Sequence, residues 1–492
     1  MYTMTDLFCG AGGSGLGATS VPGVELIMAA NHSPRAIETH QLNFPGCAHD
    51  CADISQVEPR RYRRSNILWA SPECTNHSIA RGRKHLDVAQ PDLFGDVVPD
   101  HVAERSRATM WDVPRFAEAH RYDVVIVENV VDAAKWAPFR AWLMAMDSYG
   151  YHHKLVSLNS MHAPAIAAPR APQSRDRLYV VFWRKGNPAP DLDIRPAAWC
   201  PGCDREVAAV QSWKNPATTV GRYRQQYLYR CPNTACRNEI VEPYALPAAS
   251  AIDWSLAGQR IGDREKPLSG KTLARIEAGL RRFTGPQLVT AGGSWNDATY
   301  PAGHPFRTRT TRESEALLVP VEGRDGKQAT HSSEPMRTQT TRRETALVVP
   351  YYGTGVAREA TRPMPTMTTV DTAGLAFVAE LRGGRSDARH VAEPLATVCA
   401  GGNHHMLVRH QPPEEKTSAP VPDAVPDVDD CRFRMLAVHE IQAAMAFTPG
   451  YQVTGNKRER VRQLGNGVTP PAAEWLVRAA VASLETRTAR AA

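Results

Sequence analysis

The chain of 492 residues carries 58 lysines and arginines against 51 aspartates and glutamates, a formal net charge of +7, and is 42% hydrophobic. This length allows two or three domains with a substantial core, and no run approaches the roughly 18 to 20 apolar residues that cross a bilayer, which excludes a membrane-spanning protein. The cysteines cluster too unevenly for an extracellular disulfide framework and the N-terminus shows no secretory leader, so a cytoplasmic protein is expected. The positive charge fits a polyanionic partner, and arginine richness from the base composition of the gene is the alternative explanation.

Short apolar strands alternate with helical segments from the N-terminus to about residue 185. The helical pattern is clearest at 34–43 and 107–120. This alternation predicts an α/β fold with a parallel, doubly wound (Rossmann-like) sheet. The expected strands are 4–8, 25–29, 67–69, 123–127, 154–158 and 178–182.

A glycine-rich turn, "DLFCGAGGSGLG" (6–17), follows the first expected strand and opens a helix. Glycines let backbone N–H groups approach a ligand closely, and a helix N-terminus favours negative charge, so the turn predicts a cofactor site, with a plain tight turn as the alternative. Asp53, in "CADIS" after a further possible strand, is the candidate for contacting an adenine edge. A helix-capping role for Asp53 remains open.

Four reactive or charged side chains lie at the ends of neighbouring expected strands. Cys74 follows the strand 67–69 in "ASPECTNHSIARG", and Glu128 ends the strand in "VIVENV". Arg175 and Arg177 are two residues apart in "PQSRDRLYVV", so both can face one side of the next strand. Each alone could be surface decoration, but together they indicate a catalytic constellation of a thiol, a carboxylate and two guanidinium groups.

Two cysteine pairs lie in the middle of the chain. Cys200 and Cys203 form one pair, and Cys231 and Cys236 form the second. Four thiolates paired in this way suit a tetrahedral structural zinc ion, with buried unligated cysteines as the alternative.

The region after about residue 196 is rich in Thr, Gly, Pro and Arg and contains a repeat. "PFRTRTTRESEALLVP" (305–320) and "PMRTQTTRRETALVVP" (335–350) are similar, and weaker copies follow. Each unit predicts a β-hairpin. The arginines of these hairpins are predicted to contact guanine edges and phosphates, and a solvated charged face is the alternative; they are Arg307, Arg309, Arg312, Arg337, Arg342 and Arg343.

The motifs, in their order, resemble the DNA (cytosine-5) methyltransferases of phages and bacteria. The resemblance covers about 1–185 and 431–485, and it rests on the glycine-rich start, "CADIS", "SPECTNHS", "ENV", "PQSRDR", "RMLAVHEIQAAMAF" and "RQLGNGVTPPAAEWL". It implies a sheet that binds S-adenosyl-L-methionine, a separate target-recognition domain, and a cytosine flipped out of double-stranded DNA. The family has Pro directly before its cysteine, whereas this chain has Glu73 there, with Pro72 one residue earlier.

The resemblance also assigns roles. Cys74 would add to cytosine C6, which turns the ring into an enamine whose C5 attacks the methyl group. Glu128 would meet N3 as the acid, Arg177 would steady O2, and Arg175 would orient the thiolate and its loop. The residues that match the family's cofactor motifs are Phe8, Gly10, Gly12, Asn466 and Val468, beside Asp53.

The leading hypothesis is therefore an enzyme that methylates cytosine C5 in double-stranded DNA, acting as a monomer in a bacterial or phage-infected cell. The alternative is a non-catalytic zinc-ribbon DNA-binding protein on a degenerate methyltransferase scaffold. The expected domains are a catalytic domain (1–195), a zinc-ribbon-like insertion (196–250), a β-hairpin target-recognition domain (251–410), a linker (411–430) and C-terminal helices that complete the catalytic domain (431–492).

Overall fold

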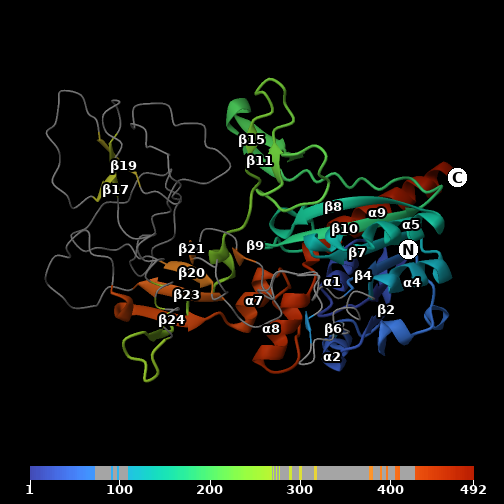
Figure 1. Cartoon of the computed structure of the whole chain (residues 1–492), viewed down its shortest axis with the longest axis horizontal. Helices are drawn as coiled ribbons and strands as arrows, with labels where there is room; N and C mark the ends of the chain where they lie inside the picture. The colour runs from blue at the N-terminus through green and yellow to red at the C-terminus, as the bar shows by residue number, and fades with distance from the viewer. Residues whose placement is uncertain are drawn as a thin grey trace.

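The computed structural model describes residues 1–72, 109–268 and 427–491, together with short strands and isolated helical positions between these ranges. Figure 1 shows the described parts as coloured ribbons, with both chain ends at the same side of the main sheet. Among the described helices, none is long and apolar enough to cross a membrane.

A seven-stranded sheet forms the centre of the fold, in the order β3-β2-β1-β4-β7-β10-β8. All neighbouring pairs from β3 to β7 are parallel, whereas β10 is antiparallel to both β7 and β8. The predicted doubly wound α/β sheet is confirmed, and the prediction that all its strands are parallel is wrong for β10. The strands are β1 (Tyr2–Leu7), β2 (Val24–Asn31), β3 (Ala48–Cys51), β4 (Ile67–Ala70), β7 (Val124–Asn129), β8 (Tyr151–Asn159) and β10 (Asp176–Arg184).

Helices cover both faces of this sheet, so its strands are buried on both sides. Met4, Trp69 and Ile126 contribute to one core cluster, and their strand neighbours Leu68 and Val125 contribute to the other. Successive residues of a strand point to opposite faces, so each central strand is apolar throughout. On the first face lie α1 (Gly13–Thr19), α2 (Pro34–Asn43) and α9 (Pro470–Ala491); on the second lie α4 (Asp112–His120) and α5 (Phe139–Ser148).

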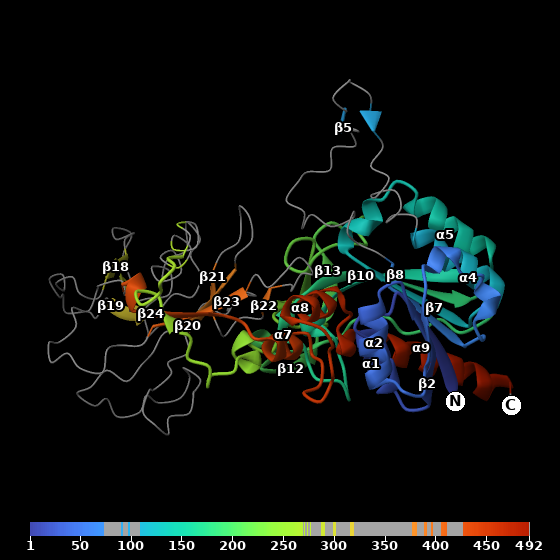
Figure 2. The same ribbon diagram turned by 90° about the horizontal axis from the view of Figure 1, so that it is seen from below.

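The C-terminal helix packs directly on the first helix of the chain. Gly13 and Gly17 allow this approach, because a Cβ atom at Gly13 would lie 1.9 Å from the Val468 carbonyl oxygen, and one at Gly17 would lie 2.2 Å from that of Pro470. The end of the chain is therefore part of the same layer as the glycine-rich turn. Figure 2 shows α9 running beneath the sheet beside α1. Two further helices precede it, α7 (Val438–Ala444) and α8 (Lys457–Asn466).

Residues 196–245, called the cysteine module below, form two small antiparallel sheets that project from the main sheet (Figure 1). The first is a hairpin, and the second has three strands. The strands are β11 (Ala197–Cys200) and β12 (Arg205–Ala208), then β13 (Val210–Trp213), β14 (Tyr227–Arg230) and β15 (Ile240–Val241).

A five-stranded sheet, in the order β16-β24-β23-β20-β21, lies on the far side of α7 and α8 from the main sheet (Figure 2). It joins strands from both sides of residues 411–430, so the segment from residue 431 begins inside this sheet and only then enters the helices. Its strands are β16 (Gln259–Arg260), β20 (Ala376–Glu380), β21 (Ala388–His390), β23 (His405–His410) and β24 (Cys431–Met435).

The remaining strands form two pairs and one three-stranded sheet among the described residues. β9 (Gln173–Ser174) pairs with β22 (Leu395–Ala396), so residue 395 reaches the strand that precedes Arg175. Three strands, β17 (Gln287–Thr290), β18 (Thr299–Pro301) and β19 (Glu315–Leu318), form a further sheet, and β5 (Gln90–Pro91) pairs with β6 (Val97–Val98). The six hairpin arginines of the repeat lie outside the described residues.

Candidate active site and cysteine cluster

The carboxyl ends of β1, β4 and β7 form one edge of the main sheet, and the start of β10 reaches the same edge. In register, Leu178 of β10 lies opposite Asn129, the last residue of β7. Because β10 is antiparallel, its first residues lie where the parallel strands end. A ligand in an open α/β sheet binds outside these carboxyl ends, so this edge is the candidate active site.

Glu128 and Arg177 form an ion pair at this edge. The Nε atom of Arg177 lies 2.9 Å from Oε1 of Glu128, and the two side chains are only 12% and 10% exposed, respectively. A second guanidinium nitrogen, Nη1, donates to the backbone oxygen of Asp176 at 2.8 Å. The guanidinium group is thus fixed from two sides and holds the carboxylate in one orientation, as a preorganised site requires.

Arg175 contacts the C-terminal part of the chain. Its side chain is buried, and Nη2 donates to the carbonyl oxygens of Gly465 at 3.1 Å and Gly467 at 3.0 Å. These carbonyls flank Asn466 at the end of α8. The sequence did not indicate this contact, because the partners are about 290 residues apart.

Cys74 lies outside the described residues. The described segment that leads to it leaves β4 at Ala70, and the carbonyl oxygen of Pro72 accepts a hydrogen bond from Nδ2 of Asn129 at 3.4 Å. The end of β7 is thereby tied to the segment after β4. No role for Asn129 was predicted from the sequence, although its place beside Glu128 in "ENV" was a usable signal.

The glycine-rich turn directly follows β1 and has the backbone conformation that its residues predict. Gly10 and Gly12 have φ angles of 53° and 82°, and Phe8 has a φ of 60°. A side chain at Gly12 would also collide with the ring hydroxyl of Tyr451, 2.3 Å from the ideal Cβ position. Only glycine fits there at low cost. The turn closes on itself through the Gly12 N–H, which donates to the Cys9 carbonyl oxygen at 2.9 Å.

Asp6, at the end of β1, is fully buried, and it was not assigned a role from the sequence. Its Oδ2 atom accepts a hydrogen bond from Ser14 Oγ at 2.5 Å, while Oδ1 is buried with no hydrogen-bond partner among the described residues. Burial raises the pKa of Asp6 to about 7, against the lowering effect of the Ser14 hydrogen bond. A carboxyl oxygen without a partner beside a glycine turn fits a polar ligand in the turn.

The raised pKa of Asp6 predicts a pH dependence of stability. The unfolded chain releases this proton near pH 3.9, whereas the native protein keeps it up to about pH 7. Between about pH 4 and about pH 7, Asp6 is ionised in the unfolded chain but protonated in the native protein. The free energy of unfolding therefore falls as pH rises through this range, by roughly 1.4 kcal/mol per pH unit at most.

Asp6→Asn should lack this term, so denaturant unfolding should show the variant gaining stability relative to wild type across the same pH range. Two buried histidines, His40 and His162, have pKa values lowered to about 3 by burial and act in the opposite direction. Their effect is common to both proteins and cancels in the difference. A pH-independent difference would show that Asp6 does not hold its proton.

Asp53 caps a short 3₁₀ helix. Its Oδ1 atom accepts from the Ser55 N–H at 3.2 Å, at the start of the turn Ile54–Gln56, and the residue is exposed. Asp53 thus has the geometry of a helix cap, and its contact with an adenine edge stays a prediction. Asn31, the last residue of β2, accepts the N–H of Ser33 through Oδ1 at 2.9 Å.

Asn466 is the last residue of α8, and Val468 lies in the short segment between α8 and α9. Val468 is buried, its carbonyl oxygen faces Gly13 of the glycine-rich turn, and Asn466 is exposed. Arg175 holds the carbonyls on either side of Asn466. The structure thus brings the C-terminal candidates for the cofactor site next to the N-terminal ones.

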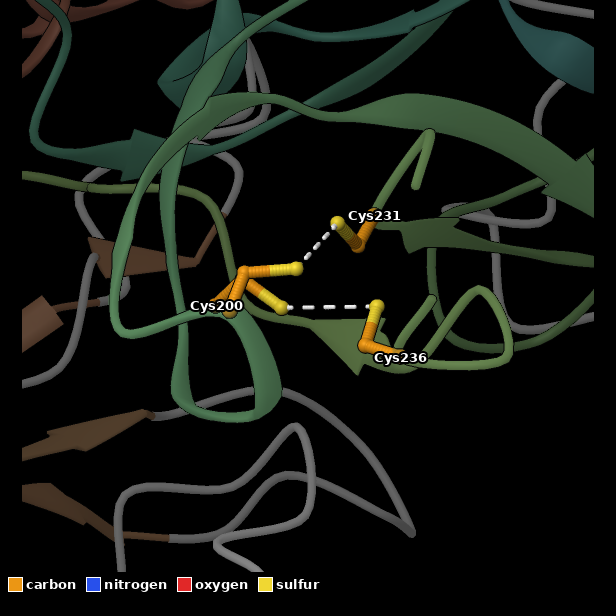
Figure 3. Close-up of side chains that lie close together, drawn as sticks. Cys200, Cys231 and Cys236 are labelled. Atoms are coloured by element: carbon orange, nitrogen blue, oxygen red, sulfur yellow. Dashed lines mark hydrogen bonds between the residues drawn. The ribbon is translucent and has the colours of Figure 1, made fainter. Parts of the chain in front are cut away.

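The four cysteines of the module converge on one point. Their sulfur atoms all lie within 4.8 Å of one another, with Cys200 3.8 Å from Cys236 and Cys203 3.8 Å from Cys231. Figure 3 shows Cys231 and Cys236 on one side of the cluster and Cys200 facing them on the other. The Asn233 N–H also donates to the Cys231 sulfur at 3.5 Å.

Three of these thiol groups differ in pKa because their surroundings differ. Burial raises the pKa of Cys200 to about 12 and also raises that of Cys231, while a backbone hydrogen bond from Glu239 lowers that of Cys236 to about 7. A tetrahedral zinc ion with Zn–S bonds of about 2.3 Å would place its sulfur ligands about 3.8 Å apart. The Cys200–Cys236 and Cys203–Cys231 separations of 3.8 Å match that spacing, and the four sulfur atoms lie close enough to hold such an ion.

The comparison with known families places this chain. Residues 2–482 match the model of the C-5 cytosine-specific DNA methylase family, and the chain belongs to that family. It is 25% identical over 190 residues to the Type II methyltransferase M1.ScrFI of Lactococcus lactis subsp. cremoris, an alignment that covers 37% of this chain and 42% of that one. It is 26% identical over 185 residues to the Type II methylase M.HgiEI of Herpetosiphon aurantiacus, covering 37% of each chain. The chain thus spans about two fifths of the length of the curated relatives it matches.

Solved structures that align with this chain include S. pombe Dnmt2 methyltransferase, with a TM-score of 0.46 and 10% identity over 98% of this chain and 99% of that one. A putative DNA modification methyltransferase encoded within a prophage of E. coli aligns with a TM-score of 0.42 and 13% identity over 99% and 100% of the two chains. The family assignment rests on the match over residues 2–482.

Proposed function

We propose that this protein transfers a methyl group from S-adenosyl-L-methionine to C5 of cytosine in double-stranded DNA. The observation that carries the proposal is the buried Glu128–Arg177 pair, at the sheet edge where the glycine-rich turn and the segment leading to Cys74 also lie. Membership of the cytosine-specific methylase family supports the choice of reaction and of cofactor.

The chemistry needs an acid and a cation at the base, because cytosine C5 is a poor nucleophile. When the Cys74 thiolate adds to C6, the electron pair of the C5–C6 bond moves toward N3 and O2. After C5 has gained the methyl group, it loses its proton to solvent and the thiolate leaves C6, which restores the aromatic base and the free thiolate. Glu128 would share a proton with N3, and Arg177 would stabilise the charge on O2. The base has to leave the duplex to reach these groups, and unpairing it costs a few kcal/mol.

The glycine-rich turn and the C-terminal segment would hold the cofactor, which supplies the activated methyl group. Phe8, Gly10 and Gly12 give the turn its left-handed backbone, and the buried Oδ1 of Asp6, which has no partner among the described residues, offers a polar contact. Asn466 and Val468 reach the same place through the close contact between α1 and the start of α9. Asp53 remains a proposed contact to the adenine ring.

A second proposal is that the cysteine module binds a structural zinc ion. The sulfur spacing and the donation of the Asn233 N–H to a sulfur atom support it. Four thiolates leave no open coordination position, so the ion would stabilise the module and take no part in methyl transfer.

The zinc proposal predicts about one zinc ion per chain by elemental analysis of protein purified without added metal. Cys231→Ser should reduce bound zinc severely and lower the thermal stability of the module, since structural zinc supplies folding free energy directly. Cys51→Ser is the matched control, because Cys51 is an exposed free cysteine remote from the cluster. A fully folded, metal-free wild-type protein would contradict this proposal.

Sequence recognition is proposed to lie in residues 251–410, which carry the repeated hairpins and their arginines. In this proposal the protein acts as a monomer on double-stranded DNA in the cytoplasm of a bacterial or phage-infected cell. Bisulfite sequencing of DNA from cells that express the protein would reveal both the activity and the target. Unmodified DNA from cells that contain folded protein would favour the non-catalytic DNA-binding alternative.

A further inference from the structure

One loop of the cysteine module touches the main sheet beside the candidate active site. This segment, residues 219–223, is called the docking loop. The N–H of Gly221 donates to Ser157 Oγ of β8 at 3.1 Å, and Gln211 of β13 donates from Nε2 to the Ser157 carbonyl oxygen at 2.9 Å. Gly221 and Tyr223 are buried, so the contact excludes water.

On one side, the docking loop binds the turn that follows Glu128. The Arg222 guanidinium forms an ion pair with Oδ2 of Asp132, and Lys135 lies 2.9 Å from the other oxygen of the same carboxylate. Asp132 belongs to the 3₁₀ helix Val131–Lys135, which begins three residues after Glu128. Arg222 therefore restrains the segment that carries the proposed acid.

On the other side, the docking loop binds the residue next to Arg177. The Tyr223 N–H donates to Oδ1 of Asp176 at 3.0 Å. The backbone oxygen of Asp176 accepts from Arg177, whose Nε pairs with Glu128. Burial raises the pKa of Asp176 to about 6, and the Tyr223 N–H counteracts this rise. A largely buried carboxylate is costly unless donors satisfy it, and one of its donors comes from the module.

Contacts between aromatic rings hold the docking loop in place on the main sheet. The ring of His162, in the 3₁₀ helix after β8, meets the rings of Tyr223 and Tyr229 edge-on, with centroids 4.5 and 5.2 Å apart. Burial holds the pKa of His162 near 3, so this ring is neutral and packs as an apolar group at ordinary pH. The docking loop thus has a fixed position on the sheet.

We infer that the cysteine module positions the acid site: the docking loop fixes Asp176 and Asp132, and through them the Glu128–Arg177 pair. This inference rests on the proposed function and adds two positioning residues to it, Arg222 and Asp176. It also gives the module a role in positioning the site, beside the zinc-binding role that its cysteines suggested. A displacement of about 1 Å in such a pair can cost about 100-fold in rate, so a distant loop can control the chemistry.

The first test compares Arg222→Ala and Asp176→Ala with wild type in single-turnover methylation. Both variants should lower the rate of methyl transfer about 10- to 100-fold, with cofactor affinity within about twofold of wild type. Arg222→Lys should recover most of the rate, because lysine can still pair with Asp132. Arg195→Ala is the matched control: Arg195 also pairs with two aspartates, at 2.8 and 3.0 Å, but it is exposed and lies outside the docking loop.

The second test does not depend on activity. In hydrogen exchange, Arg222→Ala should speed the exchange of amides in 129–135 and 175–179 and leave those in 6–17 unchanged, with zinc content as in wild type. Wild-type rates and wild-type exchange in both alanine variants would overturn the inference, as would equal losses in Arg195→Ala. If wild type methylates no cytosine, the proposed function fails, and the exchange experiment still decides whether the docking loop orders the two segments.

Discussion

Replacing Cys74 with alanine should abolish methyl transfer while DNA and S-adenosyl-L-methionine still bind within about twofold of wild type. Without the thiolate, C6 receives no nucleophile, and C5 does not acquire enough electron density to attack a methyl group. Transfer of labelled methyl groups to DNA measures the rate, and equilibrium binding measures the two affinities. Wild type should also form a covalent adduct with DNA that contains 5-fluorocytosine, because the fluorine at C5 cannot leave as a proton does.

Cys51→Ala is the matched control for this experiment. Cys51 ends β3 in the same sheet, and it is an exposed, free cysteine. The control variant should methylate at the wild-type rate and form the same adduct. Normal methylation by Cys74→Ala would eliminate covalent catalysis by this residue, and loss of the adduct in Cys51→Ala would move the nucleophile to β3.

The central strands of the sheet were predictable because each is a short apolar run between polar segments. Strand direction was not, since the alternation of side chains is the same in both directions. That direction decides the geometry of the site: in an all-parallel sheet the start of 178–182 would lie at the edge opposite Glu128. The antiparallel β10 instead brings Arg177 within 2.9 Å of Glu128.

Contacts between segments far apart in the sequence were also not predictable from local sequence patterns. The two-residue spacing of Arg175 and Arg177 suggested that both side chains face one side of the strand, but it gave no sign that Arg175 donates to the carbonyls of Gly465 and Gly467. Asp176, between these arginines, gave no local sign that its partner would be the Tyr223 N–H.

The cysteine cluster was more accessible from the sequence because each pair brings its own short turn. After Cys203, Asp204 has a φ of 49°, and after Cys236, Arg237 has a φ of 58°, so both turns close in the same left-handed way. Only the position of the two cysteine pairs relative to each other could not be predicted without the structure. Asp53 shows the opposite situation, because a carboxylate before a short turn suits a cap and a ligand contact equally well.

Glu128→Gln should slow methyl transfer by about 10² to 10⁴-fold, the usual contribution of a general acid. Glutamine keeps the shape of the side chain and an oxygen that can accept from Arg177, but it cannot share a proton with cytosine N3. Single-turnover rates measured from about pH 6 to about pH 9 isolate the chemical step from product release. Binding of DNA and cofactor should change little.

The substitution also removes the negative partner of a largely buried arginine, which by itself can destabilise the protein by several kcal/mol. Glu440→Gln provides the matched control, since Glu440 is fully buried and pairs with Arg434 at 2.7 Å, away from the candidate active site. It should lower the free energy of unfolding without a comparable loss in the single-turnover rate. If Glu128→Gln loses stability but methylates as fast as wild type at every pH, Glu128 serves only to hold Arg177, and the proton at N3 comes from another group. A rate loss confined to Glu128→Gln assigns the proton transfer to this carboxyl group, because both variants remove the charge of a buried ion pair and only one of them lies at the base.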